Sequence, residues 1–260
     1  MFRFKAGLLP FMIIIKSENE IAIMRKAGQI LSSIRKDLIL SLKEGVSTFA
    51  LDMIARELIE KHGVVSAFKG YKGFDGYMCT SVNEAIVHGI PSKKQILKKG
   101  DIITIDMGIK YQGYYVDSAW TYAIGKVSKK VATLLENTEK SLFAGIKQVK
   151  PGNRISDISA AIFEIGKKNK YGIVEVFSGH GIGLQLHEKP YIFNFDFVDK
   201  DYILQPGMTF CIEPMFTLGT KEVKILNDGW TAITADKSLS AHFEHTVLVT
   251  ENGYEILTLT

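Results

Sequence analysis

The sequence predicts an α+β protein made of two related halves, because its segments recur at one constant spacing. Gly45 and Gly152 precede two helix-like segments and lie 107 positions apart. Gly100 and Gly207 precede two strand-like segments and are separated by the same 107 positions. A single offset that holds for both helix and strand indicates two halves with the same order of elements. We therefore expect pseudo-symmetric αβ halves that pack about an approximate two-fold axis.

Helices are expected in both halves. The first begins at Ser17, which forms a capping box with Glu20, and apolar residues then follow at helical spacing as far as Ile39. A second amphipathic segment is closed by Gly63, since glycine readily takes the left-handed conformation that ends helices. The expected helices cover residues 17–39, 48–62, 129–149 and 156–168.

Short apolar runs rich in β-branched residues predict strands. Two of these runs, 102–107 and 114–122, flank a turn around Gln112 and Gly113 and should form a hairpin. Further strands are expected over residues 78–83, 173–177 and 246–250.

Composition limits the class of protein. The net charge of +4 comes from lysines spread along the chain, which favours a solvated surface over a specific nucleic-acid site and leaves contact with an acidic surface such as a ribosome open. Two cysteines, Cys79 and Cys211, do not suggest a disulfide framework or a zinc ribbon. We expect a cytoplasmic monomer, and no stretch reaches the length of a membrane-spanning helix.

The first residues resemble the start of a signal peptide, because Arg3 and Lys5 precede an apolar run. That run is short, contains Pro10 and lacks a small-residue cleavage site. We therefore interpret residues 1–11 as an N-terminal extension, either a product of an upstream start codon or a dispensable tail, with targeting as the less favoured alternative. Residues 12–260 are expected to form one domain.

Acidic residues stand out within the apolar strands. Asp106 lies inside a buried-looking run, where an unpaired carboxylate would be costly. Asp117 follows eleven residues later, so the hairpin would bring the two acids face to face. Glu213 lies 107 positions after Asp106 and would approach it near the two-fold axis. If Asp106 and Asp117 stood alone, they could simply be two aspartates satisfied by ordinary hydrogen bonds. The acidic residues later in the chain make a different explanation necessary.

Glu244 precedes the strand at 246–250, and His180 lies between two glycines. Four carboxylates and one imidazole suit divalent ions such as Mn, Fe(II), Co or Zn. Without metal, each close carboxylate pair would repel by about 4 kcal/mol at a separation of roughly 4 Å and an effective dielectric of about 20. Two divalent ions would neutralise the four charges and activate a water molecule as nucleophile.

Simpler catalytic motifs do not fit. Gly179, Gly181 and Gly183 lack the spacing of a dinucleotide-binding loop. His187 and Glu188 have no second histidine four residues on, which excludes a zincin, and no Gly-x-Ser-x-Gly is present for a serine hydrolase.

The chain resembles the type I methionine aminopeptidases of the bacterial or organellar kind, over residues 12–260. The resemblance rests on five motifs: His88-Gly-Ile-Pro, the Asp106 and Asp117 pair, Gly179-His-Gly-Ile-Gly with His187, Ile212-Glu-Pro-Met, and Ser238-Leu-Ser-Ala-His-Phe-Glu-His. The resemblance implies a pita-bread fold with a central curved antiparallel sheet. It also implies a single catalytic domain that removes the initiator methionine from nascent chains when the second residue is small.

The resemblance implies a role for each ligand. Asp117 and Glu244 would bridge two metal ions, Asp106 would complete one site, and His180 with Glu213 would complete the other.

It also implies the catalytic and substrate-binding residues. Glu213 would double as proton shuttle, His187 would stabilise the oxyanion, and His88 would contact the substrate amide or the leaving amine. The residues implied for the methionine pocket are Tyr71, Phe74, Cys79 and Trp230.

Some positions depart from the family pattern. Leu186 replaces an aromatic residue, and Asp75 stands where proline is usual. Cys211 and His242 occupy positions that often carry threonine and glutamine. Each lies two residues from an implied ligand, so strand alternation places it on the same face.

Two alternatives stay open. A proline-specific (X-Pro) aminopeptidase of the same fold would share the five ligands, but the Glu213-Pro214-Met215 sequence and the lack of a large N-terminal domain disfavour it. A pita-bread protein without catalysis could serve as a binding module, although such proteins usually lose ligands and all five are present here.

Overall fold

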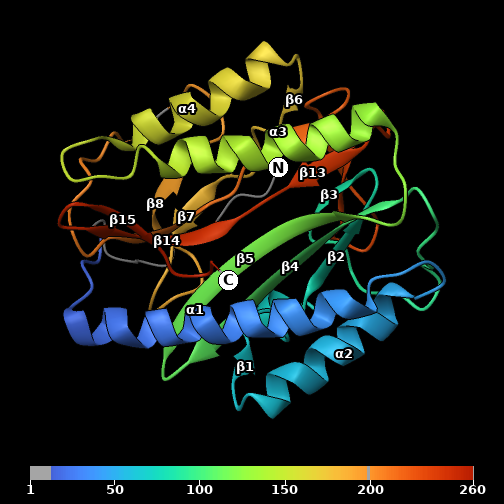
Figure 1. Cartoon of the computed structure of the whole chain (residues 1–260), viewed down its shortest axis with the longest axis horizontal. Coiled ribbons are helices and arrows are strands. Elements are labelled where there is room, and N and C mark those ends of the chain that lie inside the picture. The colour runs from blue at the N-terminus through green and yellow to red at the C-terminus, as the bar shows by residue number, and fades with distance from the viewer. Residues whose placement is uncertain (1–12, 198–199, 260) are drawn as a thin grey trace.

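The computed structural model describes residues 13–197 and 200–259, so the proposed extension at 1–11 lies outside the described residues. Figure 1 shows α1 and α2 on one side of the strands, and α3 and α4 on the opposite side. The helices are α1 (Glu18–Leu38), α2 (Thr48–Lys61), α3 (Lys129–Ile146) and α4 (Ile155–Lys168), with short 3-10 turns at Ile39–Ser41 and Tyr71–Gly73. The strands are β1 (Val65–Ser66), β2 (Cys79–Val82), β3 (Ala85–Val87), β4 (Ile102–Tyr111), β5 (Tyr114–Ala123), β6 (Gly172–Ile173), β7 (Gly179–Gly181), β8 (Glu188–Ile192), β9 (Thr209–Ile212), β10 (Met215–Thr217), β11 (Val223–Ile225), β12 (Ala232–Thr234), β13 (Ser240–His242), β14 (His245–Thr250) and β15 (Gly253–Ile256).

The internal repeat of the sequence is also a repeat of the structure. Both ends of α4 lie 107 positions after the corresponding ends of α2, and β9 begins 107 positions after β4. The isolated bridge between Ser47 and Ile96 recurs between Arg154 and Ile203, again shifted by 107 on both sides. The prediction of two related αβ halves is therefore confirmed.

The hairpin of β4 and β5 forms the centre of the first half. Gln112 and Gly113 have φ values of 46° and 92°, the two positive angles that a two-residue hairpin turn requires. Ten residue pairs follow from Tyr111 opposite Tyr114 to Ile102 opposite Ala123. On its other edge β4 pairs with β1 and β2, and α1 packs on β4 and β5.

Helix α1 is fixed by a capping box at its start and by a close contact with the C-terminal segment of the chain. Ser17 and Glu20 form the predicted capping box. Gly28 faces Leu257, whose carbonyl oxygen would lie only 1.9 Å from a β-carbon at this position. Only glycine therefore allows the helix to approach the C-terminal segment this closely.

The second half contains a five-stranded sheet in the order β15-β14-β9-β7-β8. It meets the first half along β5. The amide of Glu244 donates to the carbonyl of Ala119 at 2.8 Å, and the Thr246 hydroxyl donates to the carbonyl of Asp117 at 2.8 Å. These bonds bring the acids of the two halves to one place.

One expected strand is much shorter than predicted. The run at 173–177 continues β6 only to Ile173. Val176 is 67% exposed, so the chain leaves the sheet although Ile173, Val174 and Val176 are β-branched. Among the described residues, no helix is long and apolar enough to cross a membrane.

Candidate metal centre

The acids of the first half lie on one face of the hairpin. Asp106 pairs with Ala119, and Asp117 pairs with Gly108. The two acids are therefore diagonal neighbours on the same face of the hairpin. The prediction that they lie directly opposite each other was wrong, because the residue opposite Asp106 is Ala119, two positions after Asp117. A β-carbon at Gly108 would lie 3.3 Å from Asp117 Oδ1, so glycine leaves room for the carboxylate.

Glu244 joins this pair from the other half. It lies between β13 and β14 and is 2% exposed. Ligand oxygens of Asp106, Asp117 and Glu244 all lie within 4.8 Å of one another. A divalent ion could therefore contact all three carboxylates.

His180 lies in β7 between two glycines that neighbouring strands require. A β-carbon at Gly179 would be 2.3 Å from the carbonyl oxygen of Cys211, and one at Gly181 would be 2.2 Å from that of Lys189. We expected these glycines to let backbone approach a ligand. In the structure, Gly179 and Gly181 allow adjacent strand backbones to approach closely. This packing holds His180 beside the acidic side chains.

The protonation of His180 suits a metal ligand. Its Nδ1 lies 3.0 Å from the carbonyl oxygen of Gly181, a contact in which Nδ1–H must donate. Burial lowers the pKa of His180 to about 4, which keeps the ring neutral. A neutral imidazole with its proton on Nδ1 carries a free lone pair on Nε2, and this atom lies 3.6 Å from Glu213 Oε1.

Cys211 is a candidate donor that the ligand set drawn from the sequence did not include. Ligand atoms of His180, Cys211 and Glu244 lie within 4.8 Å of one another, so Glu244 belongs to two donor groups. Strand alternation had placed Cys211 on this face, and the structure agrees. Its thiol also lies 3.6 Å from the hydroxyl of Thr246.

The carboxylates are electrostatically unfavourable without a cation. Burial, with the charges of Asp117 and Glu213, raises the pKa of Asp106 well above its ordinary value. Burial also raises the pKa of Glu213 and Glu244 well above the usual range, and that of Asp117 to about 7. Asp106 Oδ1 and Glu244 Oε1 are buried, and neither has a hydrogen-bond partner in the described part of the chain. A bound cation would satisfy these atoms and reverse the pKa shifts, so the residues fit a divalent metal.

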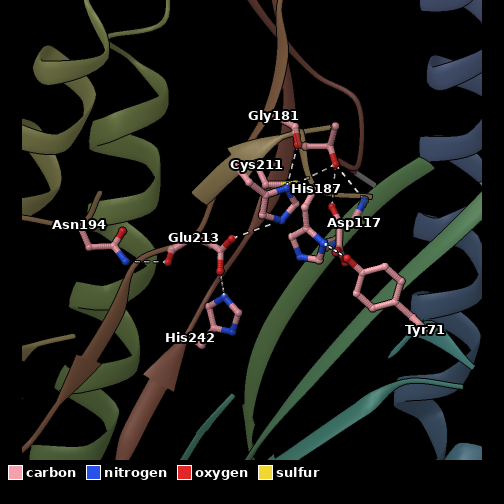
Figure 2. A network of polar contacts seen from close by, with 11 residues as sticks. Tyr71, Asp117, Gly181, His187, Asn194, Cys211, Glu213 and His242 are labelled. Carbon is pink, nitrogen blue, oxygen red and sulfur yellow. Dashed lines mark hydrogen bonds and ion pairs between the residues drawn. The ribbon is translucent and has the colours of Figure 1, made fainter. Parts of the chain in front are cut away.

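Glu213 follows β9 and lies beside the donor groups. Figure 2 shows its backbone carbonyl accepting from the side chain of Asn194, at 3.1 Å, while its carboxylate faces His242. Asn194 is completely buried, and no motif in the sequence pointed to this contact. The pairing of β9 with β14 places Ile212 opposite His245, which brings Glu213 and Glu244 close together at the end of the two strands.

His187 extends the site towards the 3-10 turn that contains Tyr71. Its Nδ1 lies 2.9 Å from the hydroxyl of Tyr71 (Figure 2). The centroid of its ring is 4.3 Å from the centroid of the His180 ring. Leu186, which precedes it, is 3% exposed and belongs to the core of the first half.

Three of the remaining predicted residues, Phe74, Trp230 and His88, place their rings side by side and form what we call the aromatic wall. The rings of Phe74 and Trp230 meet edge to face, with their centroids 5.2 Å apart. The centroid of the His88 ring lies 6.2 Å from that of Trp230 and 5.3 Å from that of Phe177. Phe177 was not predicted, because it lies in the segment that we expected to be a strand. Cys79 pairs with Asp106 across β2 and β4, and so links the first acid to β2.

Comparison with known proteins decides the family. The model of the family described as metallopeptidase family M24 matches residues 22–251. The chain belongs to the M24 family. This membership identifies the chain as a metallopeptidase. Together with its methionine aminopeptidase relatives, it confirms the resemblance drawn from the motifs.

Similar M24 proteins are methionine aminopeptidases. Methionine aminopeptidase 1 of Bacillus subtilis (strain 168) is 47% identical over 247 residues, covering 95% of this chain and 99% of the relative. The crystal structure of methionine aminopeptidase from Thermotoga maritima has a TM-score of 0.93 and 40% identity, covering 96% of this chain and all of that one. The pita-bread fold is thereby confirmed.

A more distant M24 structure is the prolidase from Pyrococcus furiosus. It has a TM-score of 0.78 and 28% identity, and this chain covers 66% of its length. Both the identity and the coverage favour the methionine aminopeptidases as the nearer kind.

Proposed function

We propose that this chain is a methionine aminopeptidase that removes the N-terminal methionine from nascent proteins when the second residue is small. The observation that carries the proposal is the pair of donor groups that share Glu244, beside the histidine and aromatic residues that a peptide substrate would need. The 47% identity to a methionine aminopeptidase over nearly the whole chain supports the same reaction.

Two divalent ions, Mn, Fe(II), Co or Zn, fit the donors. Asp117 and Glu244 would contact both ions, Asp106 would complete one position, and His180 with Glu213 would complete the other. Glu244 shares one donor group with Asp106 and Asp117 and another with His180 and Cys211, and Glu213 Oε1 lies 3.6 Å from His180 Nε2, which together support two positions. When bound, the ions would supply Lewis-acid activation of a water molecule and of the scissile carbonyl.

His187 is suited to stabilise the oxyanion of the tetrahedral intermediate. If the Tyr71 hydroxyl donates to Nδ1, the neutral ring carries its proton on Nε2, where it can donate to the developing negative charge. Glu213, whose carboxylate lies beside His180 and the other acids, would take a proton from the attacking water and pass it to the leaving amine.

His88 and the rest of the aromatic wall would hold the substrate. Burial lowers the pKa of His88 to about 4, so the ring is neutral and can donate to the substrate amide or to the leaving amine. Phe74 and Trp230, with Tyr71 and Cys79, would contact the apolar methionine side chain.

The substrate also defines the partners and the place of action. We expect the enzyme to meet nascent chains at the ribosome in the cytoplasm, which is consistent with the net charge of +4 and two free, buried cysteines. All proposed ligands come from one chain, so the site does not require a residue from a second copy.

A peptide assay tests the proposal against its alternatives. Metal-loaded protein is given Met-Gly-Met-Met, Met-Phe-Met-Met and Ala-Pro-Met-Met, and products are identified by mass spectrometry. We expect methionine release from the first peptide only. Cleavage of the X-Pro peptide instead would identify a proline-specific enzyme, and no cleavage of any peptide would favour a binding module.

A further inference from the structure

His242 is a buried histidine to which neither the ligand set nor the substrate contacts assign a role. It is 1% exposed, and its Nε2 lies 3.6 Å from Glu213 Oε2 (Figure 2). Within the described residues, neither ring nitrogen has a hydrogen-bond partner. Two buried polar atoms without partners are costly, so the position of this ring needs an explanation.

The backbone of His242 is firmly placed. Its amide donates to the Thr121 hydroxyl at 2.9 Å, and its carbonyl accepts from the same hydroxyl at 2.7 Å. In β13 it pairs with Met215 of β10, two residues after Glu213. The imidazole is thus held against the carboxylate by strands from both halves of the molecule.

Glu213 lies between two imidazoles. His180 Nε2 is 3.6 Å from Oε1, and His242 Nε2 is 3.6 Å from Oε2. His180 already donates through Nδ1 to a carbonyl, so its Nε2 offers a lone pair and no proton. His242 makes no such contact in the described part of the chain, so of these two rings it is the one that can offer an N–H to the Glu213 carboxylate.

We propose that His242 is a positioning residue that directs Nε2–H at Glu213 Oε2 and turns Oε1 towards the ion shared with His180. The inference rests on the proposed metal centre. A hydrogen-bonded carboxylate loses less rotational freedom when it binds an ion, and partners of this kind typically change metal affinity by about 10- to 100-fold. His242 then acts through Glu213 and does not itself contact the reacting atoms.

Two substitutions of matched chemistry test the role. His242→Gln keeps an amide N–H near the position of Nε2, whereas His242→Asn carries the same amide on a side chain one methylene shorter. His242→Leu removes the donor altogether. His245→Leu is the matched control, because His245 is equally buried nearby but bonds Thr258 and packs on Trp120.

The readout is Co²⁺ binding to chelator-stripped protein, followed by calorimetry and by the visible spectrum of the bound ion. We expect His242→Asn and His242→Leu to weaken one Co²⁺ position by about 10- to 100-fold and to change its spectrum. His242→Gln and His245→Leu should stay within about threefold of the unsubstituted protein. Thermal unfolding identifies folded variants, and the Gln and Asn pair keeps the test decisive if His242→Leu does not fold.

Three outcomes would overturn the inference. These are unchanged Co²⁺ binding in folded His242→Asn, equal losses in the Gln and Asn variants, or an equal loss in His245→Leu. Because binding is measured without peptide, failure to release methionine would count against the proposed function and not against the role of His242.

Discussion

Lys16 Nζ lies 2.7 Å from Glu188 Oε2, and the two side chains are only 2% and 5% exposed. Lys16 lies just before α1, while Glu188 directly follows His187. The second carboxylate oxygen of Glu188 accepts from the amide of Gln185 at 2.9 Å. This buried ion pair therefore ties the segment before the first helix to the loop that carries His187.

Removing this cation should destabilise the protein and disturb catalysis together. Lys16→Met leaves the Glu188 carboxylate buried without a partner, a change that typically costs about 3–5 kcal/mol. We expect a loss of that size in the free energy of unfolding from urea denaturation. At temperatures where the variant is folded, kcat should fall while the metal content stays unchanged, because neither residue is a proposed ligand.

Arg25→Met is the matched control. Arg25 also ties α1 to a distant strand, through Glu255 at 2.6 Å, but the two side chains are 41% and 33% exposed. An exposed pair of this kind contributes about 0–1 kcal/mol. If Lys16→Met were as stable and as active as Arg25→Met, the ion pair would have no special part in holding the His187 loop.

Glu213→Gln should cost several orders of magnitude in kcat. The substitution removes a proposed ligand and the proposed proton carrier at once, while leaving the size of the side chain nearly unchanged. Metal content by elemental analysis and kcat for a Met-Gly peptide are measured on the same sample. A variant with near-normal kcat would show that neither role belongs to Glu213.

His88→Ala and His187→Ala should each lower kcat/KM by about 10²- to 10³-fold, the usual effect of losing one transition-state donor. Both should retain their metal, since neither histidine is among the five proposed ligands. Tyr71→Phe provides a finer test, because it removes the 2.9 Å contact to His187 and leaves the pocket ring in place. Unchanged rates in both histidine variants would contradict the assigned contacts.

Much of the fold follows from local signals in the sequence. Ser17 with Glu20 marked the start of α1, and Gln112 with Gly113 fixed the hairpin. The diagonal arrangement of the acids also follows from this two-residue turn, because pairing Tyr111 with Tyr114 places Asp106 opposite Ala119. The direct pairing that we expected ignored this register.

The parts that could not be predicted depend on distant contacts. The three-residue strands β10 and β13 pair with partners far along the chain and have no periodicity of their own. Asn194 reaches the carbonyl of Glu213 from a loop without any motif. The sequence predicted the correct strand face for His242. The orientation of its ring towards Glu213, however, depends on how the two halves pack together.

Deleting residues 1–11 should leave the enzyme intact. These residues contain no proposed ligand, and the capped helix begins after them. We expect kcat/KM for a Met-Gly peptide within about twofold of the full chain, which corresponds to less than about 1 kcal/mol. A tenfold loss in a folded, metal-loaded truncation would show that this segment contributes to the working enzyme.

The most direct test of the metallopeptidase mechanism is the release of free methionine from Met-Gly-Met-Met before and after metal removal. Protein dialysed against a chelator should release none, and addition of Mn, Fe(II) or Co should restore equimolar release of methionine and Gly-Met-Met. Full activity in protein that elemental analysis shows to be free of metal would contradict the account.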